Sequence, residues 1–210
     1  FSIVSYTGNG TAGANAGHGL GKAPKLMFHK SLDQSKNWYT ITTAVDGSPD
    51  YLYLNLTNQA LDSAVTAPTS DLIYFTSSTE SNNNNERYIA YCWAEIEGYS
   101  KFGSYAGNGS TDGPFVYCGF KPAWVLIKRT SSDGYFWTIY DNARKPTNPV
   151  NHTMTPDQTN MEVTTGGNGQ HDFLSNGFKC RNADGGINAS AETYLFAAFA
   201  ESPFQTANAK

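Results

Sequence analysis

The chain has 210 residues, of which only 15% are charged, and its formal net charge is −4. Its polarity comes instead from Asn, Ser, Thr, Gly and Tyr, a mixture that favours β-strands and tight turns over helices. No basic run is available to neutralise phosphates, which argues against a nucleic-acid partner. No apolar stretch approaches the roughly 18 residues of a membrane-spanning helix, which argues against a membrane protein.

The first structural signal along the chain is a turn at Gly8-Asn9-Gly10, because an Asn-Gly pair adopts positive φ at little cost. The apolar run 26–30 follows Pro24 and predicts a buried strand, since a proline at a strand start gives up no ladder hydrogen bond. Residues 38–43 predict its return strand, across a hairpin-like turn at 33–35.

The first half of the chain ends in an apolar run from Tyr88 to Ile96. Large apolar side chains alternate there with Ala and Cys, so both faces of the expected strand are apolar. That pattern is typical of a central strand covered on both sides. The polar stretch 81–85 just before it is interpreted as a hairpin loop.

The same signals then return in the same order, which indicates an internal duplication. The returning segments are the turn 107–109, the strand 124–129 after Pro122, the return strand 137–141 and the closing strand 192–201. Pro122 follows Pro24 by 98 residues and Tyr194 follows Tyr88 by 106, so the spacing drifts only by loop insertions. We therefore predict two homologous units, 1–98 and 99–204, and a tail at 205–210.

Short strands at regular spacing, Gly/Asn turns and the lack of a sustained helical period predict an all-β protein. We expect two tandem β-sandwich, jelly-roll-like units related by pseudo-twofold symmetry. A single merged sandwich is the alternative.

The sequence offers no catalytic or metal-binding motif. Glu95 and Glu97 share one face of a strand and Glu201 repeats Glu95, but capping of turn N–H groups is favoured over a glycosidase pair. The histidines lack metal-ligand spacing. Loops rich in Asp, Asn and Gly are compatible with Ca²⁺, yet no EF-hand spacing occurs. We predict no catalytic residue, no metal site and no cofactor.

The three cysteines, Cys92, Cys118 and Cys180, are odd in number and widely spaced. That arrangement fits neither a disulfide framework nor a metal site. It predicts buried free thiols, with one disulfide bridge as the alternative.

A polar loop at 145–172 is the most unequal part of the two halves. Such loops on a rigid β scaffold often carry binding, and the aromatic run 135–137 beside Asn and Asp suits sugar recognition. The predicted ligand-binding residues are Tyr135, Asn151, His152, Asp157, Asn168 and His171. The alternative is a variable surface loop that binds nothing.

Four long segments carry a resemblance to a known family: 88–109, 115–130, 172–179 and 197–204. Together they resemble a repeat domain of unknown function found in tailed-phage tail-fibre-like structural proteins, often C-terminal to a concanavalin A-like lectin domain. The resemblance implies a virion protein and supplies no catalytic residues. Cys118 stands where the family pattern more often has Thr.

From this resemblance we expect a structural and adhesive module of a phage tail fibre or receptor-binding appendage, on the extracellular surface of a virion. Its expected partners are other virion proteins, further copies of itself in a homo-oligomer, and a host-surface glycan or protein. We expect no enzymatic activity. The alternatives are a capsid decoration or other coat module, and a polysaccharide-degrading enzyme.

Overall fold

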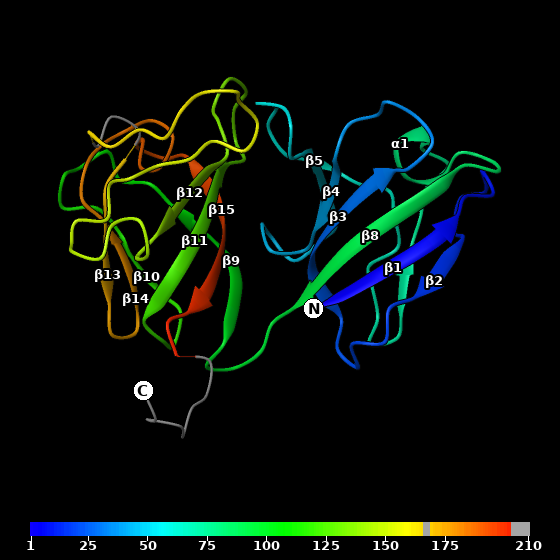
Figure 1. Cartoon of the computed structure of the whole chain (residues 1–210), viewed down its shortest axis with the longest axis horizontal. Helices are drawn as coiled ribbons and strands as arrows, with labels where there is room; N and C mark the ends of the chain where they lie inside the picture. The colour runs from blue at the N-terminus through cyan, green and yellow to red at the C-terminus, as the bar shows by residue number, and fades with distance from the viewer. Residues whose placement is uncertain (166–168, 203–210) are drawn as a thin grey trace. The chain divides into compact units, whose positions relative to one another are not determined.

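The computed structural model describes residues 1–165 and 169–202 (Figure 1). Asn168 and the predicted tail at 205–210 lie outside the described residues. The protein is nearly all β, with 41% strand and 2% helix and several antiparallel sheets, which confirms the predicted all-β sandwich class. The chain divides into two compact units, one made of Phe1–Leu56 and Ala60–Glu95, the other of Thr57–Gln59 and the chain from Ile96 onward.

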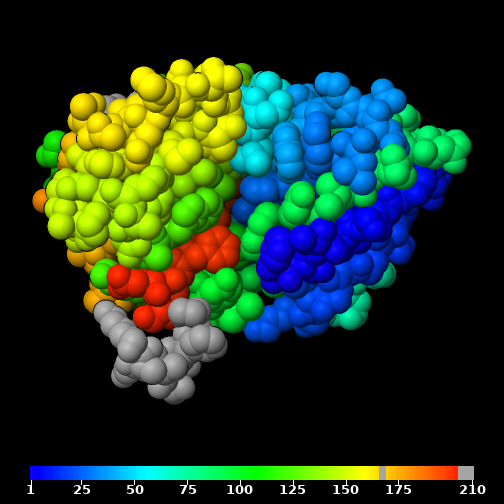
Figure 2. Space-filling view, in the orientation of Figure 1, coloured from blue at the N-terminus to red at the C-terminus, as the bar shows by residue number. Residues whose placement is uncertain are grey.

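The first unit packs a large antiparallel sheet against a small one. The large sheet has the order β1 (Ser2–Thr7), β8 (Arg87–Ala94), β3 (Pro24–Ser31), β4 (Tyr39–Thr42), β5 (Asp50–Tyr53) and β6 (Leu61–Asp62), and the small sheet pairs β2 (Asn15–Gly17) with β7 (Leu72–Tyr74). Met27, Ile41 and Cys92 from the large sheet share one core cluster with Ile73 from the small sheet. Strand β1 is an edge strand on the surface in Figure 2.

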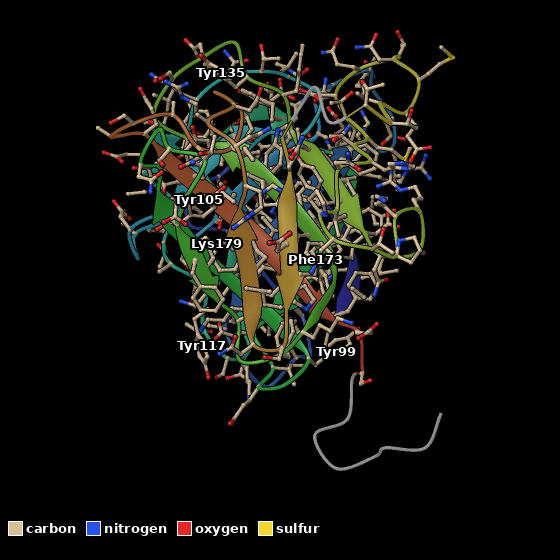
Figure 3. All side chains as sticks on the ribbon, turned by 90° about the vertical axis from the view of Figure 1, so that its left-hand side faces the viewer. Tyr99, Tyr105, Tyr117, Tyr135, Phe173 and Lys179 are labelled. Atoms are coloured by element: carbon tan, nitrogen blue, oxygen red, sulfur yellow. The ribbon has the colours of Figure 1, made fainter. Side chains whose placement is uncertain are left out.

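The second unit also packs a larger antiparallel sheet against a smaller one. Its large sheet has the order β12 (Thr138–Asp141), β11 (Pro122–Arg129), β15 (Thr193–Ala200) and β9 (Ser100–Ala106), and its small sheet the order β10 (Phe115–Tyr117), β14 (Gly177–Cys180) and β13 (His171–Leu174). Ile127 and Phe196 of the large sheet pack into one core with Phe173 and Phe178 of the small sheet. Figure 3 shows the small sheet facing the viewer.

The predicted strands and thiols are found where the sequence places them. The runs 26–30 and 124–129 lie inside β3 and β11, and both closing strands, β8 and β15, have a neighbour on each side. All three cysteines are buried and free, as predicted. Burial raises the pKa of Cys92 to about 12, so this thiol stays protonated and unreactive.

A buried asparagine holds the Asn-Gly turn of the first unit. The side chain of Asn82 accepts a hydrogen bond from Asn9 N at 2.9 Å and donates to the carbonyls of Thr11 at 2.9 Å and Thr76 at 2.8 Å. The Cβ of an added side chain at Gly8 would lie 2.3 Å from Asn83 O, so only glycine permits this approach.

Asn188 does the same in the second unit. It accepts from Asn108 N at 2.8 Å and donates to the carbonyls of Ser110 at 2.7 Å and Asn182 at 2.9 Å. Gly107 repeats the close approach, because an added Cβ there would lie 2.2 Å from Ala189 O. We call Asn82 and Asn188 the anchor asparagines.

The first anchor corrects the sequence interpretation of 81–85 as a hairpin loop. The structure instead has a single helical turn, α1 (Thr79–Asn82), in which Ser81 and Asn82 are buried. Ser78 begins the turn, and its side chain accepts a hydrogen bond from Glu80 N.

Among the described residues, no helix has the length and apolarity needed to cross a membrane.

We expect Asn82→Ala to lower the free energy of unfolding by about 1–3 kcal/mol, because it removes a buried amide that bonds the N–H of Asn9 and the carbonyls of Thr11 and Thr76. Asn82→Asp has the same shape but sets a carboxylate against two carbonyl oxygens, so it destabilises the protein further. Urea denaturation followed by circular dichroism measures both. Asn84→Ala, at an exposed neighbouring position, is the control and should change little. Equal stability of all three variants would contradict the anchoring role.

Two buried histidines make stability fall in acid. Burial lowers the pKa of His29 to about 4 and that of His171 to about 3, whereas an unfolded histidine titrates near about 6.5. Below pH 6.5 the unfolded chain therefore binds more protons, and each histidine costs about 1.4 kcal/mol of stability per pH unit until its folded-state pKa is reached.

Urea titrations at pH 7 and pH 5 measure this loss. His171→Leu should reduce it and should also stabilise the protein at pH 7, because both ring nitrogens of His171 are buried without a hydrogen-bond partner among the described residues. His152→Leu, at a half-buried position, serves as the control. An unchanged pH dependence in His171→Leu would refute this account.

Candidate functional site

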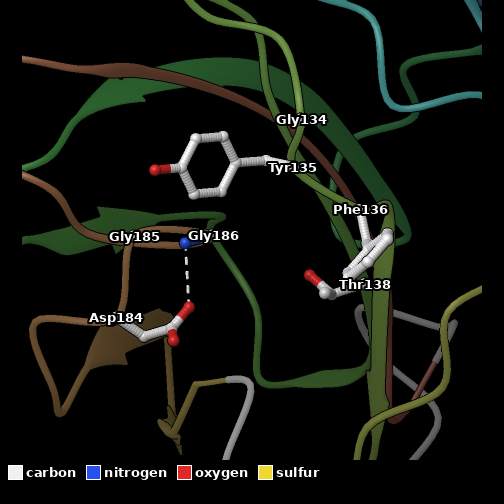
Figure 4. A pocket seen from close by; sticks show the side chains of 7 residues that line it. All are labelled: Gly134, Tyr135, Phe136, Thr138, Asp184, Gly185 and Gly186. Carbon is white, nitrogen blue, oxygen red and sulfur yellow. Dashed lines mark hydrogen bonds between the residues drawn. The ribbon is translucent and has the colours of Figure 1, made fainter.

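The second unit contains a pocket of about 210 Å³ (Figure 4). Its lining residues are Gly134, Tyr135, Phe136, Thr138, Asp184, Gly185 and Gly186. They come from two segments, the connection from β11 into β12 and the turn just before the anchor Asn188. The volume lies below the about 300–1,000 Å³ typical of drug-sized ligands, so the pocket suits a single small ring or a terminal group.

The ring of Tyr135 forms one wall and is held in place. An added Cβ at Gly185 would lie 2.9 Å from Cε1 of Tyr135, so the ring lies directly on this glycine. The guanidinium carbon of Arg129 lies 4.0 Å from the ring centroid, a cation–π distance. Contacts with both residues fix the orientation of the ring before any ligand binds.

Arg129 is itself fixed by an ion pair. Its Nη2 lies 2.5 Å from Oε1 of Glu192, its Nε donates to Oε2 at 3.2 Å, and its Nη1 donates to Gly185 O at 3.2 Å. Hydrogen bonds from Ser131, followed by those from Arg129 and Ser132, lower the pKa of Glu192. The positive charge beside Tyr135 is therefore already paired, which makes Arg129 a support for the wall and not a free anion site.

Asp184 supplies the acidic group of the pocket. Its Oδ1 accepts a hydrogen bond from Gly186 N at 2.8 Å (Figure 4). Its carbonyl accepts from Ile187 N at 3.1 Å and from Asn188 N at 2.7 Å, so the same turn leads straight into the anchor. A carboxylate accepts up to about four hydrogen bonds, which leaves capacity for the hydroxyl groups of a ligand.

The first unit also has a pocket, of about 260 Å³. Its lining residues are Tyr39, Tyr51, Tyr53, Asp62, Ser63, Ala64, Thr76 and Ser78. The backbone carbonyl of Ser78 accepts a hydrogen bond from the N–H of the anchor Asn82 at 2.8 Å, as the carbonyl of Asp184 does from Asn188. The three tyrosine rings lie within 5.6–6.0 Å of one another, which makes this pocket the more aromatic of the two.

Of the six predicted ligand-binding residues, Tyr135 lines the pocket. Asp157 is half-buried, and burial raises its pKa. Its Oδ2 accepts from the N–H of Trp137, two residues after Tyr135, at 3.3 Å. Asn151 is also half-buried, and Nδ1 of His152 lies 3.5 Å from Glu162. Neither is among the lining residues of either pocket.

His171 belongs to the core and not to a binding loop. It begins strand β13, is fully buried, and its ring centroid lies 4.4 Å from that of Tyr140 and 5.5 Å from that of Phe178. Backbone bridges tie the predicted loop down by joining Val150 to His171 and Met154 to Ile139. These bridges fix Val150 to strand β13 and Met154 to strand β12.

Sequence reasoning missed Asp184 and its two glycines. The available signal was their place in the repeat, directly before the second anchor, where Ser78-Thr79-Glu80 stands in the first half. The described residues with a geometry suited to a metal ion lie elsewhere, in the first unit.

Fold and pockets together define a two-unit antiparallel β-sandwich protein with a small aromatic and acidic pocket in each unit. The model of the family described as Domain of unknown function (DUF7483) matches residues 1–203, so the chain belongs to this family. A single family domain thus spans both units. No curated protein and no solved structure matches the chain.

Proposed function

We propose that this chain is a non-catalytic adhesive module of a phage tail fibre or similar receptor-binding appendage, and that it binds a host-surface glycan at Tyr135. The observation that carries the proposal is the fixed phenol ring of Tyr135 facing the same pocket as the Asp184 carboxylate. An aromatic ring packs against the C–H face of a sugar, while a carboxylate accepts hydrogen bonds from its hydroxyl groups.

Preorganisation favours binding at this site. Tyr135 is held by Arg129 and Gly185, and Asp184 by Gly186 and Asn188. Little conformational entropy is therefore lost when a ligand enters. A pocket of this size gives a weak single site, and a homo-oligomeric fibre would multiply weak sites into avidity.

The pocket chemistry supports binding over hydrolysis. Asp184 is the one carboxylate among the described lining residues, whereas glycoside cleavage uses two carboxyl groups about 5–10 Å apart. Glu201, which the sequence makes a candidate acid, lies 2.9 Å from Lys121 Nζ and accepts from Asn142 at 3.1 Å. It is engaged in structural contacts away from the pocket.

The virion role is proposed from the resemblance to tail-fibre-like structural proteins. The same proposal places the module on the extracellular surface of the particle, where it contacts other virion proteins. The low charge content of the chain agrees with recognition through aromatic rings and hydroxyl groups rather than through electrostatics.

Glycan-array binding of the full chain, followed by calorimetry with the best ligand, tests the proposal. Tyr135→Ala and Asp184→Asn should each weaken binding at least about tenfold, since loss of a central aromatic or charged contact costs about 1.4 kcal/mol or more. Tyr117→Ala is the matched control, because this tyrosine is 64% exposed and lies at the opposite end of the second unit in Figure 3.

Two results would contradict the proposal. Failure of the wild-type chain to bind any glycan or host envelope, together with its location on head shells in virion images, would assign it to the capsid. Release of reducing ends from host polysaccharide, lost in Asp184→Asn, would make the chain an enzyme.

A further inference from the structure

We propose that Asp46, Asp50 and Asp62 of the first unit form a Ca²⁺ site. The inference stands independently of the proposed glycan binding, because it concerns a different set of residues. Three features support the site: the spacing of the three carboxylates, the burial of Asp50 and the mutual repulsion of the negative charges.

Strand pairing and a tight turn bring the three carboxylates together. Asp50 opens β5 and is the cross-strand partner of Asp62 in β6, so both side chains leave the sheet on the same face. Asp46 lies in the turn before β5, where its Oδ1 accepts from Ser48 N at 2.8 Å and from Ser48 Oγ at 2.6 Å. The turn thereby holds the carboxylate of Asp46 close to those of Asp50 in β5 and Asp62 in β6.

The carboxylate spacing suits calcium. One oxygen from each aspartate lies within 4.8 Å of the others. Oxygens that share one Ca²⁺ at about 2.3–2.6 Å lie no more than about 5 Å apart, and Ca²⁺ accepts an irregular set of oxygen ligands, whereas Mg²⁺ demands near-octahedral order. Calcium is therefore accommodated without movement of the chain, and its remaining ligands would be water or backbone carbonyls.

Asp50 is the observation that points to a bound cation. Its side chain belongs to a residue only 4% exposed, and its Oδ2 is buried with no hydrogen-bond partner among the described residues. A buried carboxylate oxygen without a partner is costly. Asp46 and Asp62 are exposed, so an ion could reach Asp50 from solvent between them.

The negative charges of the cluster would favour a bound cation. Burial, followed by the charges of Asp46 and Asp62, raises the pKa of Asp50 to about 6. Two cations of the same unit are ion-paired elsewhere, Lys36 with Glu86 and Arg87 with Asp33. A divalent cation would remove the mutual repulsion of the three carboxylates.

The ion would also fix one rim of the tyrosine-lined pocket, since Asp62 belongs both to the acidic cluster and to the pocket lining. Binding of Ca²⁺ would therefore hold β6, the two-residue edge strand, against β5.

Calorimetric titration of the metal-free full chain with CaCl₂, and thermal unfolding with and without CaCl₂, test the site. We expect about one Ca²⁺ per chain, a higher Tm in CaCl₂ and a much smaller effect of MgCl₂. Asp50→Asn and Asp46→Asn should each weaken Ca²⁺ binding at least about tenfold, since even outer-shell partners contribute that much. Asp71→Asn, an exposed aspartate bonded to Ser70, removes the same charge outside the cluster and should bind as the wild type does.

Circular dichroism verifies the fold of each variant, and the exposed Asp46 decides the result where Asp50→Asn does not fold. Absence of both binding heat and a Tm shift in the wild type would overturn the proposal. Unchanged Ca²⁺ affinity in a folded Asp46→Asn or Asp50→Asn variant would overturn it equally.

Discussion

Each unit depends on one buried amide that satisfies three backbone groups at once. The anchor asparagines bond the Asn-Gly turn from one side and the segment before the closing strand from the other. Two segments 71–80 positions apart in sequence are thereby fixed to each other. The contact requires glycine at Gly8 and Gly107, because no Cβ fits against the facing carbonyl. A polar side chain thus provides specificity at a place where apolar packing alone would allow the turn to slide.

Both pockets lie beside these anchors. In the second unit the residues before Asn188 include Asp184 and a glycine pair, so the chain passes close enough for Tyr135 to lie on Gly185. In the first unit the same stretch is the helical turn α1, and tyrosines from β4 and β5 fill the wall instead. One backbone framework therefore presents two different side-chain sets, a common way for a scaffold to separate stability from recognition.

The sequence predicts the strands well, because alternation of apolar residues and turn glycines are local signals. The runs in β3, β8 and β11, the turns and the free thiols follow from neighbouring residues alone. His171 shows the limit, because it resembles a polar loop residue until the pairing of β13 with β14 carries it into the core. The burial of Asn82 could not be predicted for the same reason, since nothing within an Asn-rich stretch indicates which amide side chain is buried. The aspartates of the acidic cluster match no known spacing, because Asp62 reaches Asp50 through strand pairing rather than proximity in sequence.

The order of strands also sets when each unit can fold. In both large sheets the closing strand is an inner strand with a neighbour on either side, yet it is the last strand of its unit to leave the ribosome. Until β8 emerges, β1 and β3 lack the strand that pairs with both of them. In the second unit, β9 and β11 lack β15 in the same way. Such long-range closure slows folding and leaves unpaired strand edges exposed during synthesis. A ribosome that stops before Thr193 would release a second unit that lacks an inner strand of its sheet and not merely an edge strand.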